Sequence, residues 1–200
     1  MMLKTRIAVA LLVICTGTLA MAQQTPAPQM SPEEKAMMEA MQKAMTPGDA
    51  HKALNPFVGT WDVKVTSWPA PGAPPQVSTG KAEKKWILGN RYLEQRFDGT
   101  FMGQPFSGLG YTGYDNVSKQ YWGTWMDNMS TGVMSSTGTS TDGKSWTFNA
   151  TMNDPMSGKP STAQEKVTLA DKDHHSMEMW GPAPDGRNFK MMQIDYTRKK

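Results

Sequence analysis

Cysteine is almost absent from this sequence, in which Cys15 is the only one. It lies in the apolar run near the start of the chain, so the rest of the protein has no disulfide framework. A lipoprotein signal would need a small residue directly before Cys15, but Ile14 stands there. We therefore expect no lipid anchor, and we expect a fold that is stabilised by packing alone.

Long hydrophobic runs are also missing. The apolar run at residues 7–14 is too short to cross a bilayer. Lys4 and Arg6 precede it, and residues 20–22 (Ala-Met-Ala) match the small-x-small pattern of a cleavage site. The sequence thus predicts a signal peptide over residues 1–22 with cleavage after Ala22. We expect a secreted or periplasmic protein without a stable membrane anchor.

Charge of one sign does not dominate the chain either. Removing Lys4 and Arg6 from the 21 basic residues leaves 19, against 18 acidic ones. The basic residues form no stripe or cluster. A nucleic acid is therefore not an expected partner.

Motifs for nucleophilic catalysis or phosphate binding are absent as well. The sequence has no Gly-x-Ser-x-Gly pattern of the kind that presents a nucleophilic serine. The spaced glycines at residues 108–113 are followed by no helical pattern, so they cannot form a phosphate cradle. We interpret them as positions where a strand bends or packs closely.

The N-terminal part of the mature chain has helical signals. Ser31, Pro32 and Glu34 form a capping box that predicts a helix over residues 32–45, within a leader at residues 23–53. A second short helix should begin after residue 48 and reach about Leu54.

Met38, Met41 and Met45 share one face of the first predicted helix. The interpretation we favour is an apolar stripe that rests on the following domain or stays partly loose. The alternative is a thioether site for cuprous ion, because soft sulfur ligands select that metal. Only His51 lies near enough in sequence to add a nitrogen ligand.

From Trp61 onward the hydrophobic period changes to two, which is typical of half-buried strands. Trp61, Val63 and Val65 alternate with polar residues. Turn residues bound each of the segments that follow. The predicted strands cover about residues 61–66, 77–88, 91–97, 106–114, 120–126, 131–139, 145–152, 161–169, 175–180 and 188–198.

No helical pattern separates these strands, which favours an antiparallel meander. A flat sheet of this length would leave two exposed edges, and closure removes them. The predicted fold is all-β: an antiparallel up-and-down β-barrel of about ten strands over residues 54–200, preceded by one or two short helices. A barrel of this size is wide enough to hold one small ligand.

Several segments together resemble the DUF1579 family, bacterial proteins of unknown function that are grouped with the calycin, or lipocalin-like, barrels. They are FVGTW at 57–61, WILG at 86–89 with YL at 92–93, GYDN at 113–116, WMDNMSTG at 125–132, DPMSGKP at 154–160, DHH at 173–175 and KMMQIDYTR at 190–198. The resemblance covers about residues 54–199 and implies a calycin barrel. In such barrels an Arg from the last strand covers a Trp near the start of the first. Trp61 and Arg198 are the matching pair here.

The expected function is binding of a small apolar or amphipathic ligand inside the barrel. Strand alternation places Ile194 and Tyr196 on the same face as Arg198. The candidate ligand-binding residues are Trp86, Trp125, Asp127, Met134, Met192 (or Ile194) and Tyr196.

Two alternatives to ligand binding stay open. One is a structural or interaction module whose barrel is filled by its own side chains. The other is an enzyme that uses carboxylates inside the barrel, for which Glu94, Asp127 and Glu178 are the candidates. Glu94 and Arg96 could face the lumen or the surface, and we favour the surface.

His174 and His175, which follow Asp171 and Asp173, form the densest polar cluster. They could bind a metal or act as an acid–base pair. However, neighbouring strand residues point to opposite faces, so we favour a solvated turn. Some calycin barrels hold haem through a late His, which the last predicted strand lacks. We expect no cofactor and no metal.

Overall fold

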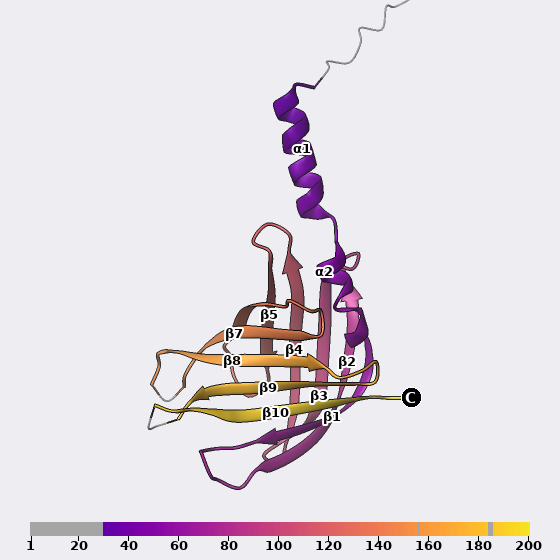
Figure 1. Ribbon diagram of the computed structural model, residues 1–200. Helices are drawn as coiled ribbons and strands as arrows, with labels where there is room; N and C mark the ends of the chain where they lie inside the picture. The colour runs from indigo at the N-terminus through magenta and orange to yellow at the C-terminus, as the bar shows by residue number, and fades with distance from the viewer. Residues whose placement is uncertain (1–29, 156, 184–185) are drawn as a thin grey trace, which may run out of the picture.

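The computed structural model describes residues 30–155, 157–183 and 186–200. The predicted signal peptide at 1–22, its cleavage after Ala22 and residues 23–29 of the leader lie outside them. The described chain begins with helices α1 (Pro32–Met45) and α2 (Asp49–Lys52) and the 3-10 turn η1 (Asn55–Phe57). Ten strands follow and form one closed barrel (Figure 1).

The strands pair in chain order, each antiparallel to the next, and β1 pairs with β10 to close the barrel. This confirms the predicted ten-stranded up-and-down β-barrel. The strands are β1 (Gly59–Ser67), β2 (Gln76–Ile87), β3 (Tyr92–Phe101), β4 (Gln104–Asp115), β5 (Gln120–Asp127), β6 (Met134–Thr139), β7 (Ser145–Asn153), β8 (Pro160–Leu169), β9 (His174–Pro182) and β10 (Asn188–Arg198).

The prediction that the third strand ends before Asp98 is wrong, because β3 continues to Phe101. Gly99 has a packing role there: a Cβ on it would lie 2.6 Å from the Thr79 carbonyl oxygen and 2.8 Å from Gly80 Cα. The glycine therefore allows close packing of strands in place of a turn. β6 begins at Met134, three residues later than predicted.

α1 extends away from the barrel (Figure 1) and has no buried residue. Its capping box is formed as predicted: Ser31 N–H donates to the Glu34 carboxylate, and Glu34 N–H donates to the Ser31 hydroxyl. The methionine stripe does not rest on the barrel, since the side chains of Met38, Met41 and Met45 are all more than half exposed. No described helix is long and apolar enough to cross a membrane.

The end of α1 is tied to loops of the barrel through its backbone carbonyls. Arg91 Nη2 donates to the carbonyl of Met45 at 2.8 Å. Asn116 Nδ2 donates to the carbonyls of Thr46, at 2.8 Å, and Lys43, at 3.0 Å. These bonds satisfy acceptors that a helix C-terminus leaves unpaired.

Residues 49–57, which we call the plug, close one end of the barrel. α2 ends at Lys52, before the predicted Leu54. The 3-10 turn η1 then begins at Asn55, with Pro56 in its first turn. Leu54 and Phe57 are buried and pack against aromatic side chains of β5 and β7. We call the opposite end, where β5 ends and β6 begins, the open end, because no helix of the described residues covers it.

Candidate functional site

Trp61 is fully buried and therefore identifies which side chains of each strand point into the barrel. Its strand partners are Ala82 on β2 and Arg198 on β10. Because side chains alternate between faces, Tyr196 and Ile194, which pair with Val63 and Val65, also face inward.

The floor of the barrel is built around Trp61 and Arg198. The guanidinium carbon of Arg198 lies 4.1 Å from the centroid of the Trp61 ring, so the expected pair is in contact. Arg198 also donates to the carbonyls of Pro56, at 2.7 Å, and Val58, at 2.8 Å. The indole N–H of Trp61 donates to the Phe57 carbonyl at 2.9 Å. This single side-chain pair therefore joins the plug to the first and last strands.

Next to the floor lies a buried pair of basic side chains. Lys84 Nζ is 2.8 Å from His175 Nε2 and 4.0 Å from the ring centroid of Tyr196. Burial lowers the pKa of Lys84 to about 7. Burial, together with the charges of Lys84 and Arg198, also lowers the pKa of His175, so the imidazole is neutral at pH 7.

The prediction of a solvated turn holds for His174 and is wrong for His175. His174 is exposed and its Nδ1 lies 2.9 Å from an Asp171 oxygen. His175 is 3 % exposed and stacks on the ring of Tyr196, with 4.2 Å between ring centroids. The two side chains differ because β9 begins at His174 and its second residue points into the barrel.

Farther from the floor, Glu165 on β8 faces inward between its strand partners Phe148 and Met179. It is 8 % exposed, and the Ser136 hydroxyl is its hydrogen-bond partner. Burial raises the pKa of this carboxyl to about 7. Burial also raises the pKa of Tyr196 to about 12, and the negative charge of Glu165 adds to that shift.

An aromatic wall lines the open half of the barrel on β3, β4 and β5. Phe106 stacks with Trp125 at 6.5 Å between centroids and 16° between planes. The Trp125 indole lies against Gly108 and Gly110, where any Cβ would collide with it or crowd it. The indole N–H donates to Asp127 at 3.0 Å. Because Gly108 and Gly110 have no side chains, β4 has room for the Trp125 indole at this position.

Methionines line the same half of the barrel from β6, β9 and β10. They pack around the buried Ala150 and Ala163. Thioether side chains are flexible and adapt to irregular shapes. The members of this methionine wall are Met134, Met177, Met179, Met191 and Met192.

Several inward-facing side chains in the middle of strands are only half-buried. They include Gln95 on β3, Thr112 on β4, Met177 on β9 and Ile194 on β10. In a closed barrel the neighbouring strands cover the flanks of such residues. These inward-facing residues therefore keep part of their surface exposed.

The structure separates the predicted ligand-binding residues into two places. Trp125, Met134, Met192 and Tyr196 share the inner face, and Asp127 lies at the open rim where β5 ends. Trp86 lies at the plug end instead, where its indole N–H donates to Asn55 Oδ1 at 2.9 Å.

The three carboxylates of the enzyme alternative do not meet. Glu94 faces outward, where Arg96 Nε lies 3.0 Å and Lys85 Nζ lies 3.7 Å from one of its oxygens. Glu178 also faces outward and pairs with Lys190 Nζ at 3.0 Å. Among the described residues, no three His, Cys, Asp or Glu side chains are grouped so that they could hold a metal ion.

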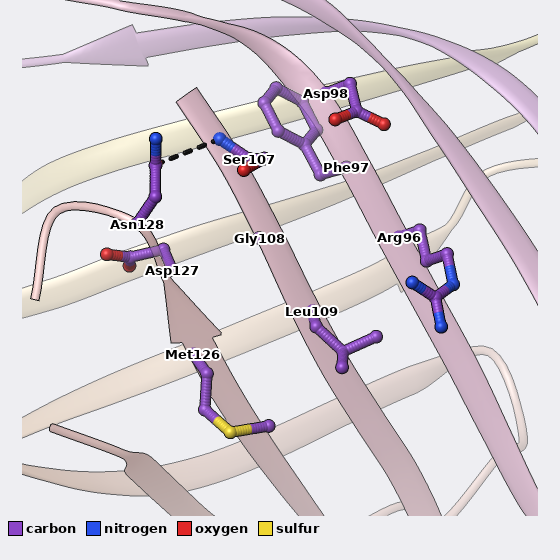
Figure 2. Close-up of a pocket in the computed structure, with 9 residues that line it drawn as sticks. All are labelled: Arg96, Phe97, Asp98, Ser107, Gly108, Leu109, Met126, Asp127 and Asn128. Atoms are coloured by element: carbon purple, nitrogen blue, oxygen red, sulfur yellow. Dashed lines mark hydrogen bonds between the residues drawn. The ribbon is translucent and has the colours of Figure 1, made fainter. Parts of the chain in front are cut away.

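Two hollows lie on the outer wall of the barrel. One, of about 430 Å³, is bounded by β3, β4 and β5 and includes Arg96, Leu109 and Met126. Figure 2 shows its lining residues and the bond from Ser107 N–H to Asn128. The other, of about 470 Å³, is bounded by β7 to β10 near Trp180.

Sequence reasoning missed the buried polar residues Lys84, Glu165 and His175. A signal for Glu165 was present, because it shares the parity of Ala163 and Val167 in its strand. Lys84 likewise shares the parity of Ala82. A charged residue at an apolar parity position is the pattern that would have identified both.

Comparison with known proteins gives a family and a fold. The sequence profile of the family described as "Protein of unknown function (DUF1579)" matches residues 46–198. No curated protein matches this chain.

Two solved structures resemble the barrel. Rv2717c from M. tuberculosis has a TM-score of 0.56 and 16% identity, over 78% of this chain and 100% of that one. An S-type phycobiliprotein lyase from Guillardia theta has a TM-score of 0.52 and 11% identity, over 80% of this chain and 97% of that one. At these identities the likeness concerns the fold.

Proposed function

This chain belongs to the DUF1579 family, and we propose that its barrel binds a small apolar or amphipathic molecule that enters through the open end. The observation that carries this proposal is the incomplete burial of inward-facing residues in the middle of their strands, such as Gln95 and Met177. A barrel filled by its own side chains would bury these residues completely.

The chemistry of the inner face supports the same function. Ligand sites are lined mainly by apolar and aromatic groups, with a few polar groups that fix orientation. Here the aromatic wall and the methionine wall provide the apolar lining. Glu165, Gln95 and Tyr196 provide the polar groups, and Gln95 Nε2 lies 3.4 Å from the Tyr196 hydroxyl. The plug closes the far end, so a ligand would have one entrance.

A direct test is native mass spectrometry of the protein purified from its own host. We expect a co-purifying small molecule in 1:1 ratio, released on unfolding. A second test uses the fluorescent probe 1-anilinonaphthalene-8-sulfonate, which should bind saturably at one site and be displaced by the host molecule.

A matched pair of tryptophan variants locates the site. Trp125→Leu removes an indole from the inner wall, and we expect it to weaken probe binding about tenfold. Trp122→Leu removes an indole from the outer face, where it packs against Tyr92, and should leave binding unchanged. Equal loss in both variants, or no saturable binding by the unmodified protein, would contradict the proposal and favour a filled module.

We also propose that the protein is exported after cleavage behind Ala22. The charged start, the apolar run and the small residues at 20 and 22 support this. N-terminal sequencing of the protein from its host should give Gln23 as the first residue. A chain that keeps residues 1–22 in the soluble cytoplasmic fraction would contradict it.

A further inference from the structure

We infer that the ligand of this barrel carries a cationic, amine-type head group and that Glu165 is the residue that binds it. The inference rests on the proposed ligand-binding function of the barrel. It adds a chemical class of ligand and a binding residue that faces the lumen from the middle of β8.

Two buried glutamates on opposite faces of the wall show why Glu165 is unusual. Glu94 is 7 % exposed and faces outward, with Arg96 and Lys85 within ion-pair distance. Glu165 is 8 % exposed and faces inward. Among the residues that the structure describes, no lysine or arginine forms an ion pair with Glu165. A buried carboxylate without a positive partner is costly, and a cation from outside the protein would relieve that cost.

The cations of the protein that lie nearest the lumen are already engaged. Lys84 contacts His175 and the face of Tyr196. Arg198 donates to plug carbonyls beneath Trp61. Neither forms an ion pair with Glu165, so this inward-facing carboxylate is not neutralised by either of them.

The surroundings of Glu165 suit an amine better than a metal ion. A metal site requires several anionic or imidazole ligands, and no such group of three exists in the described part of the chain. Glu165 has the Ser136 hydroxyl as its polar partner and the apolar residues Phe148 and Met179 as its strand neighbours. An ammonium group could donate to the carboxylate while its alkyl chain follows the apolar walls toward the open end.

The pH dependence follows from the groups that face this carboxyl. The pKa of Glu165 is raised to about 7, and that of Tyr196 to about 12. His175 stacks on the Tyr196 ring, and Lys84 contacts both of them. An alkylamine stays protonated up to about pH 10, by analogy with lysine. Amine binding should therefore be strong above pH 7 and weaken as the pH falls below 7 and Glu165 becomes neutral.

The test compares octylamine, octanol and octanoate, which share one chain and differ in head group. Binding is measured at pH 8 by isothermal titration calorimetry. We expect octylamine to bind at least tenfold more tightly than octanol, and octanoate to bind most weakly. Glu165→Gln should remove the preference for the amine, so that octylamine and octanol bind the variant with similar affinity. Glu94→Gln, which neutralises an equally buried glutamate on the outer wall, is the matched control and should retain the preference.

The outcomes separate this inference from the proposed function. Equal binding of all three chains, or an amine preference that survives in Glu165→Gln, overturns the inference alone. Failure of every chain to bind overturns the proposed function as well. Should Glu165→Gln not fold, the unmodified protein decides the matter: octylamine affinity must fall at least fivefold from pH 8 to pH 5.5, while octanol affinity stays constant.

Discussion

At the scale of the residue, the interior holds two ionisable side chains whose pKa values are shifted to about 7 from opposite directions. Burial raises the pKa of Glu165 from 4.5, and burial lowers the pKa of Lys84 from 10.5. In both cases the charged form is the unfavourable one. The shift of Glu165 therefore reduces the stability of the ligand-free barrel above pH 4.5, and the shift of Lys84 reduces it below pH 10.5.

Glu165→Gln should stabilise the protein at pH 8 and have little effect on stability at pH 4.5. The folded protein binds a proton at Glu165 more tightly than the unfolded chain does, so the stabilising effect of that proton is lost as the pH rises from 4.5 to 7. At about 1.4 kcal/mol per pH unit, the difference reaches about 3 kcal/mol at most. Urea unfolding of both proteins at each pH measures it. A difference that does not change with pH would contradict the assigned burial of the charge.

Lys84→Met should have its largest stabilising effect below pH 7, with the advantage shrinking as the pH rises toward 10.5. Unfolded Lys84 binds a proton throughout this range, whereas the folded residue loses it near pH 7. The variant also loses the contact with Tyr196, which lowers its stability equally at every pH. The slope between pH 7 and pH 10, measured by urea unfolding, is thus the informative quantity. Because the charge of Lys84 also lowers the pKa of His175, the two proteins are compared only above pH 6.5, where His175 is neutral in the folded and the unfolded chain.

These residues also mark the limit of prediction from sequence. Trp61 and Arg198 could be paired in advance through the resemblance to calycin barrels, in which an Arg of the last strand covers a Trp of the first. Lys84 and Glu165 were overlooked because charged residues in strands normally face solvent. Their parity with the apolar residues Ala82 and Ala163 is a local signal, but alone it does not show that a charged position lies inside a barrel. Only the register of neighbouring strands decides it.

At the scale of the element, strands were predictable because alternation and turn residues repeat along the chain. α1 and its capping box were also predictable, since both depend on local sequence. The end of β3 was not, because Gly99 looks like a turn residue and its role depends on Gly80 in the next strand. The position of α1 was equally unpredictable, because its methionine stripe gives no sign of whether the barrel covers it.

Deleting residues 30–45 should leave the melting temperature of the barrel within about 2 °C of the unmodified value. α1 buries no side chain, so its removal exposes no core. Differential scanning calorimetry of the two proteins checks this. A drop of 10 °C would show that the bonds from Arg91 and Asn116 to the end of α1 matter for the barrel. Copper titration of the same pair tests the cuprous-ion alternative for the methionine stripe.

At the scale of the whole molecule, stability depends on closure. β1 pairs with β10 over the full length from Trp61 to Ser67. This pairing removes the two free edges that an open ten-stranded sheet would expose. The plug then covers one end of the cylinder and is held by Arg198 from the last strand.

Removing residues 188–200 should convert the protein into aggregates. The truncation leaves β1 and β9 with unpaired backbone groups and deprives Trp61 of its cover. Size-exclusion chromatography after expression measures the soluble monomer, which we expect to disappear. The deletion of residues 30–45 is a control of similar length and should remain monomeric. A soluble, monomeric truncated chain would show that closure is dispensable.

The contact between Trp61 and Arg198 joins positions 137 residues apart in the chain. Native-like structure therefore cannot be completed while the ribosome still holds the C-terminal residues, and a topology with such distant contacts folds slowly. For a polypeptide that crosses a membrane through a narrow translocon, this delay is an advantage. In the export that we propose, the chain would cross the membrane unfolded, and the barrel would close only after β10 has been translocated.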